Sequence, residues 1–288
     1  MSGVGIQVVF GDSLDVMRTL PDGSVNLIVT SPPYADQRKH TYGGVSVDEY
    51  VEWFIPFARE MLRVLADDGS FVLNIKERVV NGERSTYVYE LVIALRKMGW
   101  LWTEEYLWHK TTTTPGKWPN RFRDLWEHLY HFTKSKKFVM NQDDVRVPIG
   151  DWSKSRLKNL SDKDRSRQES GVRSGFGKNI SNWEGKELVY PGNVLHRSSE
   201  TSNTGHSAAF PLWLPEWFIA LFTNPGDVVL DPFVGSGTTL IAAHQLGRWG
   251  IGVELLPDHE PALRKRMGES APNANVEYFH FTAQEVSS

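Results

Sequence analysis

The 288-residue sequence predicts an α/β fold with a doubly wound, mostly parallel central sheet. Short apolar runs alternate with segments of helical periodicity in two series, one before residue 140 and one after residue 210. Such alternation is typical of parallel strands whose connecting helices cover both faces of the sheet. A long polar segment separates the two series, which indicates an insertion between two halves of one sheet-forming domain.

Each element of the first series has a local signal. The apolar run Val25–Thr30 is a strand that stops where Pro32 and Pro33 follow, because proline cannot continue a strand or a helix there. Segment 47–65 carries aromatic and aliphatic residues at helical spacing, and the Asp-Asp-Gly at 67–69 stops it. The remaining strands are expected at 7–10, 70–75, 102–108 and 123–132, and the remaining helices at 14–20 and 87–98.

The second series repeats the pattern. It is expected to contain helices at 215–222, 238–246 and 257–267 and strands at 228–231 and 250–254. A last apolar run, 275–281, is a further strand that competes with 7–10 for the same place in the sheet. The predicted boundaries are 1–140 for one half of the domain, 141–209 for the polar insertion and 210–288 for the other half.

The composition is that of an ordinary globular protein. The net charge is −3, so any contact with nucleic acid requires a local basic surface. The absence of cysteine excludes disulfides, cysteine-based zinc sites and cysteine nucleophiles. Residues 1–10 lack the pattern of a signal peptide, and no apolar run approaches the ~18 residues of a membrane span. We expect a cytoplasmic protein with no membrane partner.

The polar segment carries a local excess of positive charge. Residues 151–178 hold eight Lys or Arg against four Asp or Glu. A stretch of this length is either functional or a solvated loop. If it is functional, its basic side chains are suited to binding phosphates. His128 and His131 are three residues apart in a strand-like run, and we favour a structural role for both because no neighbouring acid or Cys completes a metal site.

The segment Val228–Thr239 combines a buried strand, an acid and a glycine-rich turn that leads into a helix. Ligands bind at the carboxyl ends of strands in such sheets, and glycine lets the backbone approach them closely. Glu254 ends the next strand, where an acid accepts hydrogen bonds from ribose hydroxyls. Leu240 stands where a dinucleotide site has its third glycine, and the turn lacks the Gly-Lys of a phosphate-binding loop. Asp231, expected to point into the pocket, favours a cationic adenosine cofactor, S-adenosylmethionine (SAM). The alternative is a purely structural role, in which the glycine-rich turn only starts a helix.

Ser31-Pro32-Pro33-Tyr34 follows another apolar strand. By itself it could be a simple proline-rich turn. The functional alternative is activation of an exocyclic amine on a base, whose lone pair is delocalised into the ring. The Ser31 hydroxyl and the Pro32 carbonyl can accept hydrogen bonds from the two N–H bonds and free that lone pair, while Tyr34 stacks on the base. The Ser31 hydroxyl can also donate a hydrogen bond, for example to a ring nitrogen of the base.

Together the two motifs resemble those of the amino-group DNA methyltransferases, which methylate cytosine N4 or adenine N6 with SAM. The catalytic motif comes first, the polar insertion follows and the cofactor motif comes last, which matches the circularly permuted beta group of that family. The resemblance covers most of 7–267 apart from the insertion. It implies a Rossmann-like, circularly permuted methyltransferase sheet in which 141–209 is the target-recognition insertion.

The resemblance assigns three sets of site residues. The catalytic residues are Ser31, Pro32, Pro33 and Tyr34. The cofactor-binding residues are Asp12, Phe210, Pro211, Pro215, Asp231, Pro232, Phe233, Gly235, Ser236, Gly237, Thr238 and Glu254. For DNA binding, the resemblance points to Arg38 and Lys39 in the loop after the catalytic motif, and to Trp108, His109 and Lys110 in a segment that closes on the flipped base. The insertion corresponds to the family's specificity region by position only, and its basic residues are assigned to DNA from their charge: Lys154, Arg156, Lys158, Arg165 and Arg167. No metal is expected.

The sequence therefore predicts a SAM-dependent, sequence-specific DNA methyltransferase that flips its target base out of double-stranded DNA. Serine rather than aspartate before Pro-Pro-Tyr favours cytosine N4 as the target. Three alternatives stay open: adenine N6 methylation, RNA methylation, and a DNA-binding module with a vestigial SAM site. A cognate restriction endonuclease acting on the same site is a candidate partner.

Overall fold

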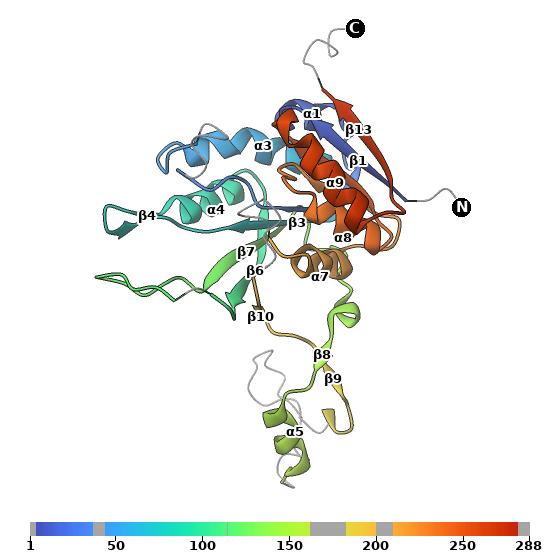
Figure 1. The fold of residues 1–288 in the computed structure, drawn as a ribbon. Helices are drawn as coiled ribbons and strands as arrows, with labels where there is room; N and C mark the ends of the chain where they lie inside the picture. The colour runs from blue at the N-terminus through green and yellow to red at the C-terminus, as the bar shows by residue number, and fades with distance from the viewer. Residues whose placement is uncertain (1–3, 37–43, 114, 162–182, 200–209, 282–288) are drawn as a thin grey trace. The chain divides into compact units, whose positions relative to one another are not determined.

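The computed structural model describes residues 4–36, 44–113, 115–161, 183–199 and 210–281 (Figure 1). Its strands are β1 (Gly5–Phe10), β2 (Val25–Thr30), β3 (Leu65–Ile75), β4 (Val79–Val80), β5 (Glu83–Arg84), β6 (Leu101–Lys110), β7 (Trp126–Thr133), β8 (Val147–Pro148), β9 (Leu188–Val189), β10 (Val194–Arg197), β11 (Val228–Asp231), β12 (Trp249–Glu254) and β13 (Asn275–His280). Its helices are α1 (Ser13–Thr19), α3 (Tyr50–Val64), α4 (Tyr87–Lys97), α5 (Asp151–Lys158), α7 (Trp213–Phe222), α8 (Thr238–Gln245) and α9 (Glu260–Ser270), with short 3-10 turns η1 (Gln142–Val145) and η3 (Pro257–His259).

Nine of the strands form one sheet in the order β10-β6-β7-β3-β2-β11-β12-β1-β13. Only β7 runs antiparallel within this sheet, where it pairs with β3 on one side and β6 on the other. The predicted doubly wound, mostly parallel fold is thereby confirmed. Because eight strands run the same way, their carboxyl ends meet at one edge of the sheet, where such folds bind ligands.

Helices cover both faces of this sheet (Figure 1). On one face, α3 and α4 pack over alternate residues of β3, with Phe54 and Leu91 among the buried side chains of that cluster. On the other face, α7 contacts α8, and Phe222 of α7 stacks on the buried His131 ring of β7 at 4.2 Å. Leu240 of α8 packs with apolar side chains of β1 and α9. The alternation of side chains along each strand supplies both apolar faces.

The competition expected between segments 7–10 and 275–281 does not occur, because both enter the sheet. The first segment is β1, which pairs in parallel with β12, with Phe10 opposite Glu254. The second is β13, which pairs with the other side of β1 and forms the edge of the sheet. The expected helix 257–267 is divided into η3 and α9, and the strand expected from residue 123 begins at Trp126.

The insertion forms a compact unit of its own at 142–192, within which β8 and β9 pair as an antiparallel ribbon and α5 carries basic residues. The expected boundary at 209 is too late. Val194–Arg197 are β10, which pairs in parallel with β6 and belongs to the main sheet. The polar character of this strand concealed it, since only Leu195 is buried.

Candidate functional site

The two sequence motifs meet at the carboxyl edge of the sheet because their strands are neighbours. β2 and β11 pair in parallel, with Ile28 opposite Leu230. The last residue of β2, Thr30, donates a 2.7 Å hydrogen bond from its hydroxyl to the Asp231 carboxylate at the end of β11. The Ser31 and Asp231 motifs, about 200 residues apart in the chain, therefore leave the sheet side by side.

Asp231 is buried, with an exposed fraction of 1%. Its Oδ1 accepts hydrogen bonds from Thr30 and from the Phe233 backbone N–H at 3.1 Å, and its Oδ2 accepts one from the Thr239 hydroxyl at 2.6 Å. The expectation that this acid points into the pocket is wrong, since its oxygens are directed to Thr30 of β2 and to the turn and start of α8. The pKa of Asp231 is raised from 3.8 to about 6. Burial is the main cause and the charge of Glu254 adds to it, while the three hydrogen bonds offset part of the rise.

The glycine-rich turn depends on conformations and spacings that only glycine permits. Gly235 and Gly237 have φ angles of 49° and 83°, in the left-handed region. On the neighbouring strand, a Cβ added to Gly252 would lie 2.7 Å from the Val234 side chain and 2.8 Å from that of Leu240. Gly252 thus lets the turn and α8 lie directly against β12, beside the predicted cofactor position.

The remaining polar residues of the turn are also engaged. Ser236 and Thr238 are buried, and their hydroxyls lie 3.4 Å apart. Arg266 of α9 donates a hydrogen bond to the Ser236 hydroxyl. The first residue of α8 is Thr238, so the backbone N–H groups of the turn lie at a helix N-terminus.

Glu254 ends β12 with an exposed fraction of only 3%. Its Oε1 accepts a hydrogen bond from the Leu256 backbone N–H at 3.0 Å and lies 3.1 Å from Nδ1 of His259. A buried carboxylate at the end of this strand is the predicted ribose acceptor. His259 was missed by the sequence analysis, because nothing in its local sequence shows that η3 brings it to Glu254.

The predicted residue Asp12 caps a helix. Its carboxylate accepts a 2.8 Å hydrogen bond from the Leu14 backbone N–H, at the start of α1. The next residue, Ser13, donates a hydrogen bond to the Pro232 carbonyl of the glycine-rich turn. The start of α1 is therefore attached to the cofactor motif, which is where the sequence analysis expected Asp12 to act.

Three further predicted cofactor residues lie before and within α7. Phe210 is 9% exposed, and the side chains of Pro211 and Pro215 are buried. The helix α7 packs against α8, which follows the cofactor motif, and against β2, which precedes the catalytic motif. These three residues are therefore near both motifs. Their burial gives them a packing role in this structure.

The catalytic motif is joined to a polar cluster that the sequence analysis missed. The Ser31 hydroxyl donates to the Tyr34 hydroxyl at 3.3 Å, and Tyr34 donates to Oε2 of Glu127 at 3.1 Å. Glu127 also accepts a 3.1 Å hydrogen bond from the Asn74 amide and one from the Lys110 ammonium. Asn74 and Glu127 are buried, and the available signal was Asn74, a polar residue that follows the apolar residues 71–73 of β3.

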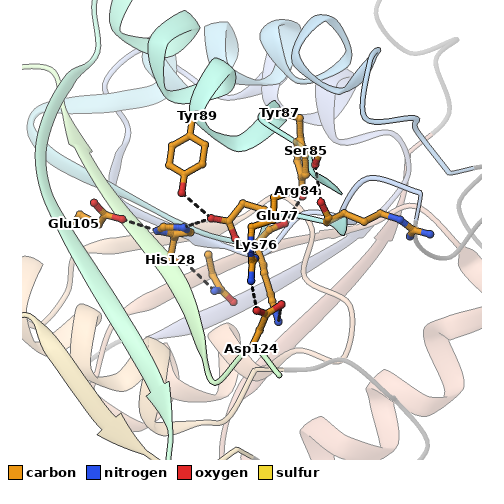
Figure 2. A network of polar contacts seen from close by, with 11 residues as sticks. Lys76, Glu77, Arg84, Ser85, Tyr87, Tyr89, Glu105, Asp124 and His128 are labelled. Atoms are coloured by element: carbon orange, nitrogen blue, oxygen red, sulfur yellow. Dashed lines mark hydrogen bonds and ion pairs between the residues drawn. The ribbon is translucent and has the colours of Figure 1, made fainter. Parts of the chain in front are cut away.

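A second polar network surrounds His128 (Figure 2). As the residue after Glu127 in β7, His128 points to the opposite face of that strand. His128 stands between two carboxylates, with Nε2 2.7 Å from Glu77 and Nδ1 2.5 Å from Glu105. The Tyr89 hydroxyl of α4 also donates to Glu77, at 3.0 Å. Burial alone would raise the pKa of Glu77, but the hydrogen bond and charge of His128 lower it to about 2.

Further ion pairs of this network join segments at the carboxyl end of β3. Lys76 lies 3.5 Å from Asp124, and Arg84 of the β4–β5 hairpin forms an ion pair with the same carboxylate (Figure 2). The hairpin and the loop before β7 are thereby connected to the end of β3. The other histidine of the pair, His131, accepts or donates a 2.9 Å hydrogen bond with Ser70, and burial lowers its pKa to about 3. His128 thus contacts two carboxylates, and His131 contacts Ser70 of β3 and Phe222 of α7.

Of the DNA contacts predicted from β6, Trp108 is not exposed to solvent. Trp108 is 3% exposed, its ring packs edge-on against Trp213, and its indole N–H donates to the Arg197 carbonyl at 3.1 Å. In this structure it is a core residue, contrary to the expectation that it faces a base. His109 lies at the same strand end, with its Nδ1 3.0 Å from that of His196.

Within the insertion unit, Lys154 and Lys158 are exposed on α5 and Arg156 is half-buried. The predicted contacts Arg38, Lys39, Arg165 and Arg167 lie outside the described residues. Among the residues that the structure does describe, no group of three or more His, Asp or Glu side chains is arranged to hold a metal ion. No helix in the described ranges is long and apolar enough to cross a membrane.

A doubly wound sheet with these two loops at one edge is the architecture of Rossmann-like methyltransferases. Comparison with known proteins gives the family directly. The chain belongs to the DNA methylase family, whose model matches residues 25–265, and it is therefore a DNA methyltransferase. The family resemblance inferred from the two motifs is confirmed.

Several relatives cover nearly the whole chain. It is 31% identical to the Type II methyltransferase M.PvuII of Proteus hauseri, over 88% of this chain and 80% of that protein. It is 28% identical to M.Cfr9I of Citrobacter freundii, over 90% of this chain and 87% of the relative. Among solved structures, the PvuII DNA methyltransferase, described as cytosine-N4-specific, matches with a TM-score of 0.69 and 26% identity, covering 96% of this chain and 95% of that one. A DNA modification methylase of Thermus thermophilus has the same fold, with a TM-score of 0.63 and 24% identity over 96% of this chain and 99% of its own.

Proposed function

We propose that this methyltransferase transfers a methyl group from SAM to N4 of a cytosine in double-stranded DNA. The observation that carries the proposal is the position of Ser31-Pro32-Pro33-Tyr34, at the end of the strand beside the cofactor motif. Serine in the first position of this motif and the cytosine-N4 specificity given for the PvuII enzyme both support N4 as the target.

The residues at the ends of β11 and β12 fit SAM chemically. Asp231 and Glu254 are both buried there, and they are close enough for the charge of Glu254 to raise the pKa of Asp231. This negative potential disfavours a polyphosphate and suits the cationic amino and sulfonium groups of SAM. Glu254 would accept from the ribose, and the backbone around Gly235 and Gly237 would hold the methionine end. When bound, SAM supplies an electrophilic methyl group.

The catalytic loop is held in a fixed shape for its task. Pro32 is buried, and the Pro33 carbonyl accepts a 2.9 Å hydrogen bond from the Tyr50 hydroxyl of α3. Ser31 and the Pro32 carbonyl can then accept from the two N–H bonds of the target amine, which draws the nitrogen toward tetrahedral geometry. The amine cannot reach this loop from within a duplex, so the base must be flipped out.

Binding of DNA is assigned to the basic insertion and to the loop after Tyr34. Lys154 and Lys158 are exposed on α5, and they are two of the eight Lys or Arg residues in the sequence 151–178. Because the whole protein carries a net charge of −3, this local excess supplies the attraction to phosphates. The Type II names of the relatives support a cognate restriction endonuclease as a cellular partner.

Nucleoside analysis tests the proposal. The purified protein is incubated with SAM labelled in its methyl group and with duplex DNA or RNA, and the digested nucleosides are separated by mass spectrometry. We expect label only in N4-methylcytosine from DNA. N6-methyladenine as the product would replace the cytosine assignment, label in RNA alone would replace the substrate class, and no transfer to either would favour a vestigial site.

The matched control is Ser31→Ala. Removing the hydroxyl should lower turnover strongly while SAM binding persists, because the lost interaction matters mainly in the transition state. Equal loss of SAM affinity would instead indicate a disrupted cofactor site.

A further inference from the structure

The Glu127 cluster beside the catalytic motif has no role in the function described above. Glu127 lies at the start of β7, is 8% exposed, and turns its carboxylate toward the catalytic loop. A carboxylate buried in a sheet is costly unless hydrogen bonds and an opposite charge compensate it. Here Asn74 and Lys110 provide both, which leaves Tyr34 as the partner on the side of the catalytic loop.

The directions of these hydrogen bonds follow from chemistry. A carboxylate can only accept, so the hydroxyl hydrogen of Tyr34 points to Glu127, 3.1 Å away, on the side where the Asn74 amide oxygen is a second acceptor at 3.3 Å. Burial, and then the negative charge of Glu127, raises the pKa of Tyr34 well above its usual value, so the phenol keeps this hydrogen. The Tyr34 oxygen can then only accept from Ser31, whose hydroxyl lies 3.3 Å away.

This sequence of bonds determines what Ser31 offers to a substrate. With its single hydrogen directed to Tyr34, its oxygen lone pairs remain to face a ligand. Asn74 strengthens the arrangement, because its amide donates both to Glu127 and to the His128 carbonyl at 3.1 Å, which ties the carboxylate to the sheet. Of the two interactions open to Ser31, acceptance from the amine is therefore favoured over donation to cytosine N3.

We propose that Glu127 is a positioning residue for methyl transfer, which acts through Tyr34 to fix the Ser31 hydroxyl as a hydrogen-bond acceptor for the target amine. This inference rests on the proposed function of the Ser31 motif. It extends that motif by one residue from a distant strand, and it explains why an acid is buried next to Tyr34, whose hydroxyl contacts that of Ser31. Glu127 itself does not touch the substrate.

The test is a double-mutant cycle in kcat with Glu127→Gln and Tyr34→Phe. Glutamine can donate to Tyr34 and so reverse the direction of the bonds, and phenylalanine removes the link altogether. Each single variant should lower kcat about tenfold, the effect of losing one oriented hydrogen bond, with the KM for SAM unchanged. If Glu127 acts through Tyr34, the double variant should be no slower than Tyr34→Phe alone.

Two comparisons make the result specific. Glu104→Gln changes an exposed carboxylate of the neighbouring strand and should keep the wild-type kcat. Glu127→Asp, which retains the charge, should recover part of the activity lost in Glu127→Gln. Wild-type kcat in Tyr34→Phe would overturn the proposal even if Glu127→Gln does not fold, and so would multiplicative losses in the double variant. Failure of the wild type to form N4-methylcytosine would instead overturn the proposed function.

Discussion

Replacement of Asp231 by asparagine should stabilise the protein at neutral pH, although it changes the acid of the cofactor motif. Burial raises the pKa of this carboxyl from 3.8 to about 6. Between these values the folded state keeps a proton that the unfolded state has lost, so stability falls as the pH rises from about 4 to above 6. At 1.36 kcal/mol per pH unit, the raised pKa of Asp231 lowers the free energy of unfolding by about 3 kcal/mol at pH 8 and by about half of that at pH 5.

The Asp231→Asn side chain is well suited to the same place. Its Oδ1 can still accept from Thr30 and from the Phe233 N–H, and its amide can donate to the Thr239 hydroxyl, which is able to accept. We therefore expect the variant to exceed the wild type by up to about 3 kcal/mol in free energy of unfolding at pH 8, and by less at pH 5.

Urea unfolding monitored by circular dichroism at both pH values measures this difference. The exposed Asp48→Asn serves as the control, and a surface substitution of this kind should stay within about 0.5 kcal/mol at either pH. A variant less stable than the wild type at pH 8, or a difference that is the same at pH 5 and pH 8, would refute the argument from burial.

Three further predictions concern the cofactor, the DNA and the packing of the turn. Glu254→Ala should weaken SAM binding by roughly 1–3 kcal/mol in calorimetry, since a charge-assisted hydrogen bond is lost, and unchanged affinity would contradict the ribose assignment. Neutralising the three basic side chains of 154–158 to glutamine should reduce the slope of log K against log salt by up to ~3 for DNA while SAM affinity holds; an unchanged slope would make α5 a solvated helix. Gly252→Ala should lower the free energy of unfolding by about 1–3 kcal/mol, because its Cβ would lie 2.7 Å from a buried valine side chain; a urea midpoint equal to that of the wild type would show that the turn can shift.

The fold was predictable because its signals are local. The apolar runs that became β2, β11 and β12 end where polar or turn residues begin, and the intervening helices show clear periodicity. The order of the strands in the sheet was harder to predict from the sequence. Segments 7–10 and 275–281 have similar apolar patterns, and only pairing on both sides of β1 shows that the sheet accommodates the two. Pairing partners are set by tertiary contacts, which a strand's own sequence does not encode.

The candidate site was predictable in its motifs and not in its supporting residues. The turn at Gly235–Gly237 and the Ser31 motif are contiguous, so their chemistry is visible in the sequence. Asn74 and Glu127 join the catalytic loop from strands 40 and 93 residues away from Tyr34, and no spacing rule connects them. The direction of a side chain was also beyond the sequence, since Asp231 turns toward Thr30 and Thr239.

The adjacency of β2 and β11 also bears on how the chain folds. The 2.7 Å bond between Thr30 and Asp231 joins residues separated by 201 positions, with the whole insertion between them. Closing so long a loop costs conformational entropy before the contact rewards it, which slows the formation of such pairs. On a ribosome, β2 emerges long before β11. Until β11 is synthesised, the edge of β2 that pairs with it has no partner strand. Methyl transfer competence therefore arises late in synthesis, when the second half of the sheet arrives.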